Sequence, residues 1–247
     1  MRLEVIVLAA GEGTRMQSSI PKVLHTVGGR PLLDHVLCVA RGLVPEALHV
    51  IVGRSGDEIR ARFEEEDVVW VDQLEQKGTG HAVMQAIDDV QSSAMVLVLF
   101  GDVPLIEQET LEACISAAEE GIGVVTVDMP VPDGFGRIQR GRDGEIEAIV
   151  EHSDATPTQR TITEINTGIL AVPATTLASL LKSITARNAQ GEYYLTDIVG
   201  LATSQGIRVV SVSATSAPEV QGINDRVQLA LVERHLQRRE AERLMAS

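Results

Sequence analysis

The first half of the chain alternates short apolar runs with segments of helical periodicity. Residues 3–10 and 95–100 are almost continuously apolar, which is typical of strands buried on both faces of a sheet. Strands that alternate with helices predict a mostly parallel α/β sheet covered by helices on both faces. Further strands are expected at 47–52 and 68–71, and helices at 31–41, 57–65, 78–87 and 107–119.

The second half departs from this rhythm. Arg142-Asp143-Gly144 is a turn sequence between two short strand-like segments, 134–138 and 145–151. The sheet is therefore expected to be mixed, with the later strands building a second side of any ligand site. Further strands are expected at 165–172 and 207–212, and helices at 175–184 and 196–205.

The C-terminal residues predict a long helix. The tail from 224 to 247 is polar, charged and free of Gly and Pro, and its leucines and valines recur at helical spacing. We expect one domain over residues 1–224, followed by a C-terminal helix over residues 225–247. The apolar stripe of this helix consists of Leu229, Val232, Leu236 and Leu244.

Composition narrows the classes of partner. The 247 residues carry a net charge of −14, which argues against nucleic-acid or anionic-membrane partners because both require a basic surface. No apolar run is long enough to cross a bilayer, and no basic-then-apolar leader precedes the first strand. Cys38 and Cys114 lie in helix-like patterns and are expected to be buried free thiols. We therefore expect a cytoplasmic protein.

The most informative segment is the loop after the first strand, Gly11-Glu12-Gly13-Thr14-Arg15. Met16 stands where a dinucleotide-binding loop would carry its third glycine, and no Walker pattern is present. Two cations, Arg15 and Lys22, flank the loop. Exposed loop amides beside fixed positive charges suit a polyphosphate, so both cations are candidate catalytic residues.

Two further segments follow predicted strands. Asp102 comes just past the strand at 95–100, where it could either cap the next helix or hold a divalent cation. Gln73 follows the strand at 68–71, and its amide can bind a pyrimidine edge. Gly78-Thr79-Gly80 could bring backbone amides to a base or ribose. His81, in the first turn of the next helix, is expected to cap or pack.

Polar residues in the second half of the chain are candidates for binding a sugar. Gly136, Glu151 and Asn166 lie in or at the ends of strand-like segments, where buried polar groups need partners such as hydroxyls or an amide. Asn224 precedes the C-terminal helix, and its spacing alone favours N-capping.

Together these segments resemble the bacterial N-acetylglucosamine-1-phosphate uridylyltransferases. The resemblance spans nearly the whole chain and implies a Rossmann-like nucleotidyltransferase fold of the GT-A-like kind. The motifs that carry it are LAAGEGTRM at 8–16, PKVLH at 21–25, GTGHA at 78–82, GDVPL at 101–105, EH at 151–152, EINTG at 164–168, NAQGEYY at 188–194 and GIN at 222–224.

The resemblance also implies roles for individual residues. For the nucleotide it implies Leu8, Ala9, Ala10, Gly11, Lys22, Gln73, Gly78 and Thr79, with Phe100 and Gly101 also among the substrate-binding residues. For the sugar it implies Gly136, Glu151 and Asn166, and for Mg²⁺ it implies Asp102 and Asn224. Phe100 stands where family members commonly have tyrosine, so only packing is expected there.

The expected reaction is the Mg²⁺-dependent attack of N-acetylglucosamine 1-phosphate on UTP, which gives UDP-N-acetylglucosamine and pyrophosphate. Two alternatives remain open. One is transfer to another sugar phosphate, such as glucose 1-phosphate, or from another base; the other is a sugar-nucleotide-binding module without catalysis. Family members usually continue into a β-helix acetyltransferase domain of hexapeptide repeats, which this sequence does not contain, so we expect a natural short form or a piece of a longer protein.

Overall fold

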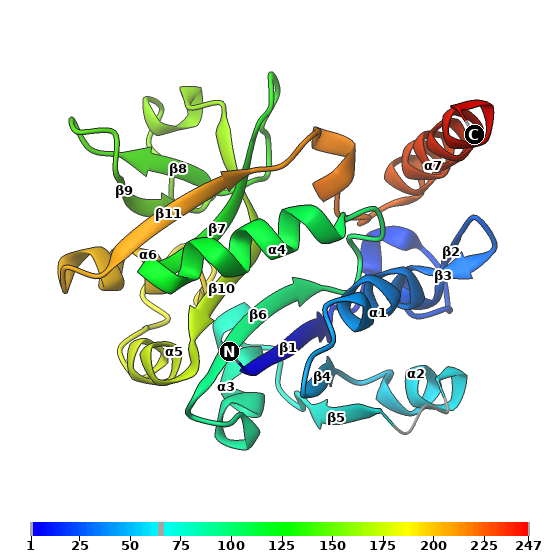
Figure 1. Ribbon diagram of the computed structural model, residues 1–247, viewed down its shortest axis with the longest axis horizontal. Helices are drawn as coiled ribbons and strands as arrows, with labels where there is room; N and C mark the ends of the chain where they lie inside the picture. Colours follow the sequence, from blue (N-terminus) through cyan, green and yellow to red (C-terminus); the bar gives the residue numbers. More distant parts are fainter. Residues whose placement is uncertain (1, 64–66, 247) are drawn as a thin grey trace.

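A mixed sheet forms the centre of the molecule. The computed structural model describes residues 2–63 and 67–246. The strand order is β11-β7-β10-β6-β1-β4-β5, and a β8-β9 hairpin branches from β10 (Figure 1). The strands are β1 (Arg2–Ala9), β4 (Ala47–Val52), β5 (Val68–Asp72), β6 (Ala94–Phe100), β7 (Gly121–Asp128), β8 (Arg137–Arg140), β9 (Ile146–Val150), β10 (Glu164–Pro173) and β11 (Arg208–Ser213), and β2 (Thr26–Val27) pairs with β3 (Arg30–Pro31) in a separate hairpin.

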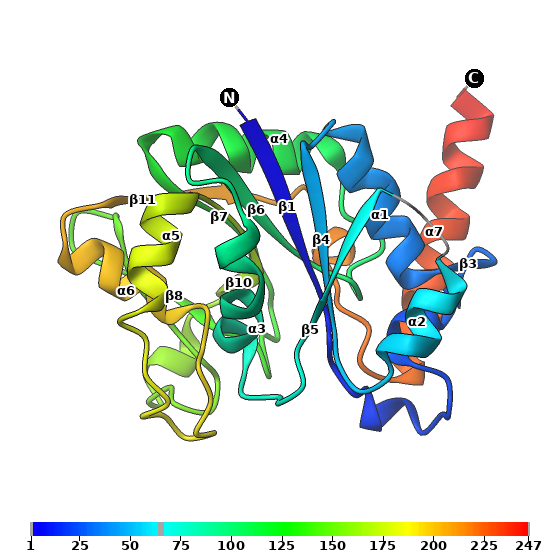
Figure 2. The ribbon, with the colours of Figure 1, turned by 90° about the horizontal axis from the view of Figure 1, so that it is seen from below.

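Helices cover both faces of the sheet, as Figure 2 shows with α1 and α4 on one side and α3 and α5 on the other. Two separate apolar cores result, one on each face. The α-helices are α1 (Leu32–Gly42), α2 (Gly56–Arg62), α3 (Thr79–Ala86), α4 (Gln108–Ala117), α5 (Ala174–Leu181), α6 (Asp197–Ser204) and α7 (Arg226–Ala246), and the 3₁₀ turns are η1 (Thr14–Met16), η2 (Lys22–Leu24), η3 (Ile87–Asp89), η4 (Ala118–Glu120), η5 (Gln159–Thr161) and η6 (Ala217–Val220).

The parallel register places several strand ends on one edge. In β1, Leu8 lies opposite Phe100 of β6, and Ala9 lies opposite Val52 of β4. Val52 in turn lies opposite Asp72, the last residue of β5. The loops that leave these strands therefore meet at the edge where open α/β sheets bind ligands.

The predicted fold class is confirmed, with corrections in detail. Strand β10 runs antiparallel to β6 and β7, which makes the sheet mixed. The sequence pattern missed β7, because the preceding helix leads into its Gly-Ile-Gly start without a turn sequence. The strand expected at 134–138 begins only at Arg137, because Phe135 N closes a turn onto Pro132 O. The helix expected at 57–65 ends at Arg62, and residues 64–65 of that prediction lie outside the described residues.

The C-terminal helix α7 packs against the first part of the chain, beside β2 and β3 (Figure 1). Val232 joins an apolar cluster with Met16, Val27, Leu32, Leu105 and Ile223, and Leu229 and Leu236 pack against it. Leu244 is two-thirds exposed, so the predicted apolar stripe is wrong at its end. The boundary between residues 1–224 and 225–247 stays a prediction.

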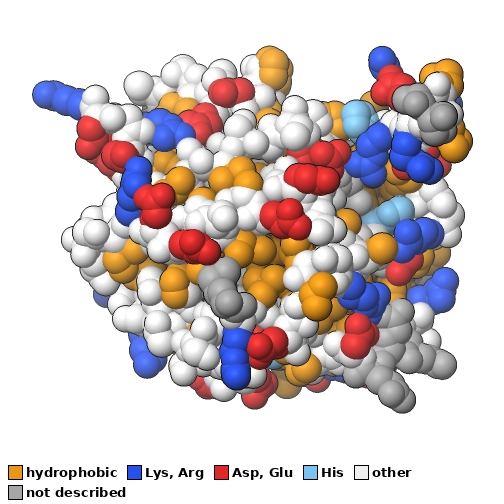
Figure 3. All heavy atoms as spheres, viewed as in Figure 1, with side chains coloured by type: hydrophobic (Ala, Val, Ile, Leu, Met, Phe, Trp, Pro, Cys, Tyr) orange, Lys and Arg blue, Asp and Glu red, His pale blue; other side chains and the backbone are white. Residues whose placement is uncertain are grey.

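The surface and the cysteines add two observations. Acidic side chains are spread over α4 and its surroundings on the face drawn in Figure 3, in keeping with the net charge of −14. Cys114 is buried, as expected, whereas Cys38 is exposed. Within residues 2–63 and 67–246, every helix is too short or too polar to cross a membrane.

Candidate active site

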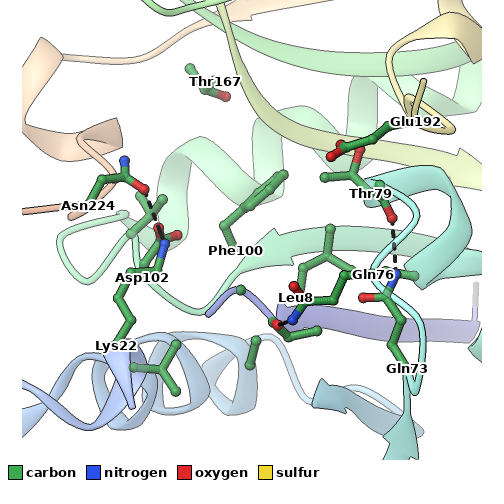
Figure 4. A pocket seen from close by; sticks show the side chains of 18 of the residues that line it. Leu8, Lys22, Gln73, Gln76, Thr79, Phe100, Asp102, Thr167, Glu192 and Asn224 are labelled. Atoms are coloured by element: carbon green, nitrogen blue, oxygen red, sulfur yellow. Dashed lines mark hydrogen bonds and ion pairs between the residues drawn. The ribbon is translucent and has the colours of Figure 1, made fainter. Parts of the chain in front are cut away.

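A pocket of about 390 Å³ opens at the sheet edge where β1, β5 and β6 end (Figure 4). Residues from distant parts of the chain, between Leu8 and Asn224, line it, so the pocket exists only in the folded protein. Of the residues singled out in the sequence, the lining contains Leu8, Ala9, Ala10, Gly11, Lys22, Gln73, Gly78, Thr79, Phe100, Asp102 and Asn224.

The glycine-rich loop closes against Lys22. Gly13 has a φ of +61°, and a Cβ built there would lie 2.6 Å from the Cβ of Lys22. Any residue with a side chain would therefore push the loop away from Lys22. Gln76 holds the start of the loop, because its Nε2 donates to Ala10 O at 2.6 Å.

Lys22 joins two oxygen-bearing side chains from distant parts of the chain. Its Nζ lies 2.5 Å from Asp102 Oδ2 and 3.2 Å from Asn224 Oδ1. The side chains of Lys22 and Asp102 are each only 12% exposed, so this ion pair is well shielded from solvent. Ile223 N donates to Asp102 O at 3.0 Å, which fixes the approach of the two segments.

Neither oxygen-bearing residue caps a helix. Helix α4 begins at Gln108, six residues after Asp102, and Asp225 rather than Asn224 caps α7, because Asp225 Oδ1 accepts from Gln228 N at 2.8 Å. In addition, Gln228 Oε1 accepts a hydrogen bond from Asn224 N at 2.7 Å. The Asn224 side chain is thereby free to face the pocket.

The donor set fits a divalent cation. One carboxylate oxygen and one amide oxygen converge on a point that already holds a positive charge, the Lys22 ammonium. Hard oxygen ligands are those that Mg²⁺ prefers, and it typically takes only one or two from protein. Asp102 and Asn224 can therefore hold such an ion if Lys22 yields part of its contact.

The Gly78-Thr79-Gly80 turn, predicted to bind the nucleotide, contacts the segment at 188–195, to which the sequence analysis assigned no site role. Gly78 has a φ of +103°, and a Cβ there would lie 2.6 Å from Tyr193 O. Gly80 N donates to Tyr193 O at 2.8 Å, and Leu195 N donates to Thr79 Oγ1 at 3.1 Å. The narrow NAQGEYY motif was the available signal for this contact.

The residues predicted to bind the sugar, Gly136, Glu151 and Asn166, form a neighbouring cluster and do not line the pocket. Gly136 O accepts from Asn166 N at 2.8 Å, and a Cβ at Gly136 would lie 3.4 Å from both carboxylate oxygens of Glu151. Burial raises the pKa of Glu151, and a hydrogen bond from Thr196 Oγ1 partly offsets this effect. Asp197 and Asp154 raise the pKa of Glu151 further through charge repulsion.

Phe100 contributes its ring to the pocket. Gly168, with a φ of +86°, faces this ring so closely that a Cβ there would lie 2.4 Å from Phe100 Cε2. The adjacent Gly101 is buried, and its N donates to Leu8 O at 2.9 Å, which joins β6 to β1 at the pocket edge. Phe100 therefore packs against the Asn-Thr-Gly segment at 166–168.

Arg15 lies elsewhere. It is exposed in η1, outside the pocket lining, so its predicted catalytic role stays a prediction. The predicted roles of the other site residues are likewise untested by their placement. Lining residues that the sequence analysis did not single out include Gln76, Phe135, Thr167, Glu192, Val220 and Gly222.

Comparison with known proteins agrees with this arrangement. Residues 5–140 match the model of the MobA-like NTP transferase domain. The chain is similar to proteins named bifunctional protein GlmU, with 51% identity in Alkalilimnicola ehrlichii and 52% in Pseudomonas aeruginosa PAO1. These alignments cover 97% and 99% of this chain but only 52% and 54% of the relatives, so the chain spans about half their length.

A solved structure of UDP-glucose pyrophosphorylase complexed with UDP-glucose has the same fold. Its TM-score is 0.75 at 16% identity, over 97% of this chain and all of that one. The similarities over nearly the whole chain confirm the resemblance drawn from its motifs. With more than half of its residues matched by the domain model, the chain belongs to the family of MobA-like NTP transferase domains.

Proposed function

We propose that this chain transfers UMP from UTP to N-acetylglucosamine 1-phosphate, giving UDP-N-acetylglucosamine, a cell-envelope precursor, and pyrophosphate. The observation that carries the proposal is the convergence of Lys22, Asp102 and Asn224 beside the Gly11 loop. The similarity to proteins named GlmU supports the choice of substrates. Because both cysteines are free thiols, we place the activity in the cytoplasm.

The reaction needs little covalent chemistry from the protein. A phosphate oxygen of the sugar substrate attacks the α-phosphorus of UTP in line. As the new P–O bond forms, the bond to the bridging oxygen breaks and its electron pair leaves with pyrophosphate. The attacking oxygen is already ionised, so no general base is required, and catalysis rests on positioning and charge neutralisation.

Each group of residues has a part in this scheme. The loop amides at Gly11 and the cations Lys22 and Arg15 bind and neutralise the phosphates. Glu151 and Asn166 orient the sugar through its hydroxyls and amide. Asp102 and Asn224 would hold Mg²⁺, which when bound supplies further charge neutralisation at the reacting phosphates.

A pyrophosphate-release assay over a panel of triphosphates and sugar phosphates tests the proposal. We expect turnover with UTP and N-acetylglucosamine 1-phosphate that EDTA abolishes and Mg²⁺ restores. Equal turnover with glucose 1-phosphate would instead indicate a related nucleotidyltransferase. Binding of UDP-N-acetylglucosamine without turnover in saturating Mg²⁺ would indicate a non-catalytic binding module.

A further inference from the structure

We propose that His81, together with the Gly78 carbonyl, sets the base preference of the site by holding one end of the Gln73 amide toward the pocket. Gln73 is 4% exposed, lines the pocket and follows β5, whereas His81 lies in the first turn of α3. The proposal rests on the proposed function, because it assumes that the pocket takes a nucleoside triphosphate.

The Gln73 amide has a defined orientation. Its Nε2 lies 3.1 Å from Gly78 O and 3.0 Å from His81 Nδ1. A carbonyl oxygen can only accept, so the amide nitrogen must face Gly78, and His81 Nδ1 takes the second N–H. Figure 4 shows the amide oxygen turned away from the Gly78 bond. Gln73 thus presents only an acceptor to the pocket.

This arrangement requires one tautomer of His81. Neutral imidazole has one donor nitrogen and one acceptor nitrogen. Gln85 Nε2 lies 3.4 Å from His81 Nε2, which would make Nε2 a second acceptor, yet both nitrogens cannot accept. The Gln73 contact is shorter and partly buried, whereas the exposed Gln85 donates its Nε2 to His81 O at 3.1 Å and approaches His81 Nε2 only at 3.4 Å. Nε2 therefore carries the proton, and Nδ1 accepts from Gln73.

The segment at 192–195 supports both acceptors of the Gln73 amide, Gly78 O and His81 Nδ1. Tyr193 N donates to Lys77 O and Tyr193 O accepts from Gly80 N, each at 2.8 Å, so the 192–195 segment clamps the turn that carries Gly78 O. The His81 ring lies 6.4 Å from that of Tyr193, centroid to centroid. The orientation of Gln73 is therefore built into the fold before any nucleotide binds.

An acceptor at this position selects among pyrimidines. Uracil carries a proton on N3, which Gln73 Oε1 can accept, whereas cytosine N3 is itself an acceptor and would face Oε1 without a proton between them. Cytosine could offer only its 4-amino group, which would require a shift of the ring against the Gly-Thr-Gly turn. Thymine shares the N3 proton, so this contact separates uracil and thymine from cytosine.

The test compares kcat/KM for UTP and CTP in the wild type and in variants of His81. His81→Phe keeps a ring but removes the acceptor, which leaves one amide N–H unpaired and the orientation of Gln73 held by the Gly78 bond alone. We expect the UTP-to-CTP ratio to fall at least about tenfold, mainly through the KM for UTP. His81→Asn, whose Oδ1 can accept in place of Nδ1, should keep the ratio within about threefold of wild type.

Gln85→Ala is the matched control, because it removes another polar side chain that contacts His81 and leaves Gln73 untouched; its UTP-to-CTP ratio should stay at the wild-type value. A wild-type ratio in folded His81→Phe would overturn the inference, and His81→Leu repeats the test if the Phe variant does not fold. Calorimetric binding of UMP and CMP makes the same comparison without turnover. Absence of turnover in the wild type would therefore count against the proposed function, while the binding ratios would still judge His81.

Discussion

Thr196 Oγ1 donates a 2.8 Å hydrogen bond to Glu151 Oε1, and this bond favours the ionised form of a carboxylate that burial disfavours. Burial raises the pKa of Glu151 most, the Thr196 hydrogen bond lowers it, and repulsion from Asp197 and Asp154 raises it further. In the proposed reaction the ionised carboxylate accepts from the sugar, so its protonation should weaken sugar binding.

Thr196→Val should shift the pH dependence of activity. Without the hydroxyl, the pKa of Glu151 rises further, so kcat/KM for the sugar phosphate should begin to fall at a higher pH as the solution is acidified. On the acid side of the profile we expect kcat/KM to fall below that of the wild type by up to about tenfold, the value of one hydrogen bond to a charged group. A pH profile of kcat/KM checks this, with Thr196→Ser as the control that keeps the hydroxyl.

Glu151→Gln should separate stability from activity. The pKa of Glu151 is higher in the folded than in the unfolded state, so ionisation of Glu151 lowers the free energy of unfolding. This loss of stability is absent below the unfolded-state pKa and complete above the folded-state pKa. The variant should therefore gain stability relative to wild type as the pH rises from 4 to 7, while kcat/KM falls about a hundredfold. Urea unfolding at both pH values measures the difference, and an equal difference at both would contradict the linkage.

The Lys22 ammonium lies where a cation held by Asp102 and Asn224 would bind, so metal and lysine should compete. Lys22→Met leaves a shielded carboxylate unpaired, which should cost about 3 kcal/mol of unfolding free energy and lower turnover by roughly 10²–10³. Added Mg²⁺ should then raise the thermal midpoint of Lys22→Met more than that of wild type. Lys77→Met, which breaks an exposed pair with Glu75, is the control. If Mg²⁺ raises the thermal midpoints of Lys22→Met and wild type equally, Lys22 and the metal do not compete.

The sequence predicted the elements of this site better than their relations. Apolar runs located β1 and β6, and the residues that follow them, Gly11 and Asp102, do line the pocket. Local pattern could not show that Lys22 contacts Asp102 and Asn224, 80 and 202 residues away. It also left capping open for Asn224, since the choice between it and Asp225 depends on which side chain points at Gln228 N.

Strand β7 and the orientation of the Gln73 amide could not be predicted from the sequence for the same reason. β7 is a strand because β10 and β11 pair with it on either side, although its first residues follow a helix without a turn sequence. The Gln73 amide is oriented by a carbonyl and a ring that contact the distant 192–195 segment. Propensity and spacing describe a segment by itself, whereas these features arise from contacts across the sheet.

A buried pair at the other end of the sheet should affect stability alone. His49 Nε2 lies 2.9 Å from Glu4 Oε2, both side chains are at most 2% exposed, and Glu4 Oε1 accepts from Gln91 N. His49→Leu would strand the Glu4 carboxylate and should cost about 3–5 kcal/mol. The double variant Glu4→Leu/His49→Leu should cost less than the sum of the singles. Chemical unfolding checks the coupling, and kcat of each folded variant should stay at the wild-type value.

Helix α7 should control the loop that carries Arg15. Arg226 Nε and Nη2 donate to Met16 O and Gln17 O at 2.9 and 2.8 Å, and Gln17 has a left-handed φ of 48°, which is costly for a residue with a side chain. Arg226→Met should remove about 1.5–3 kcal/mol of local stabilisation and speed hydrogen exchange at residues 14–24.

Because η2 in that range carries Lys22, turnover of Arg226→Met should fall about fivefold while the global unfolding transition moves little. Arg234→Met, at an exposed position on the same helix, should match the wild type in both measurements. If Arg226→Met keeps wild-type exchange at 14–24 but still loses turnover, the helix acts on the site by another route than the loop. If it keeps both, α7 has no part in ordering the phosphate-binding segment.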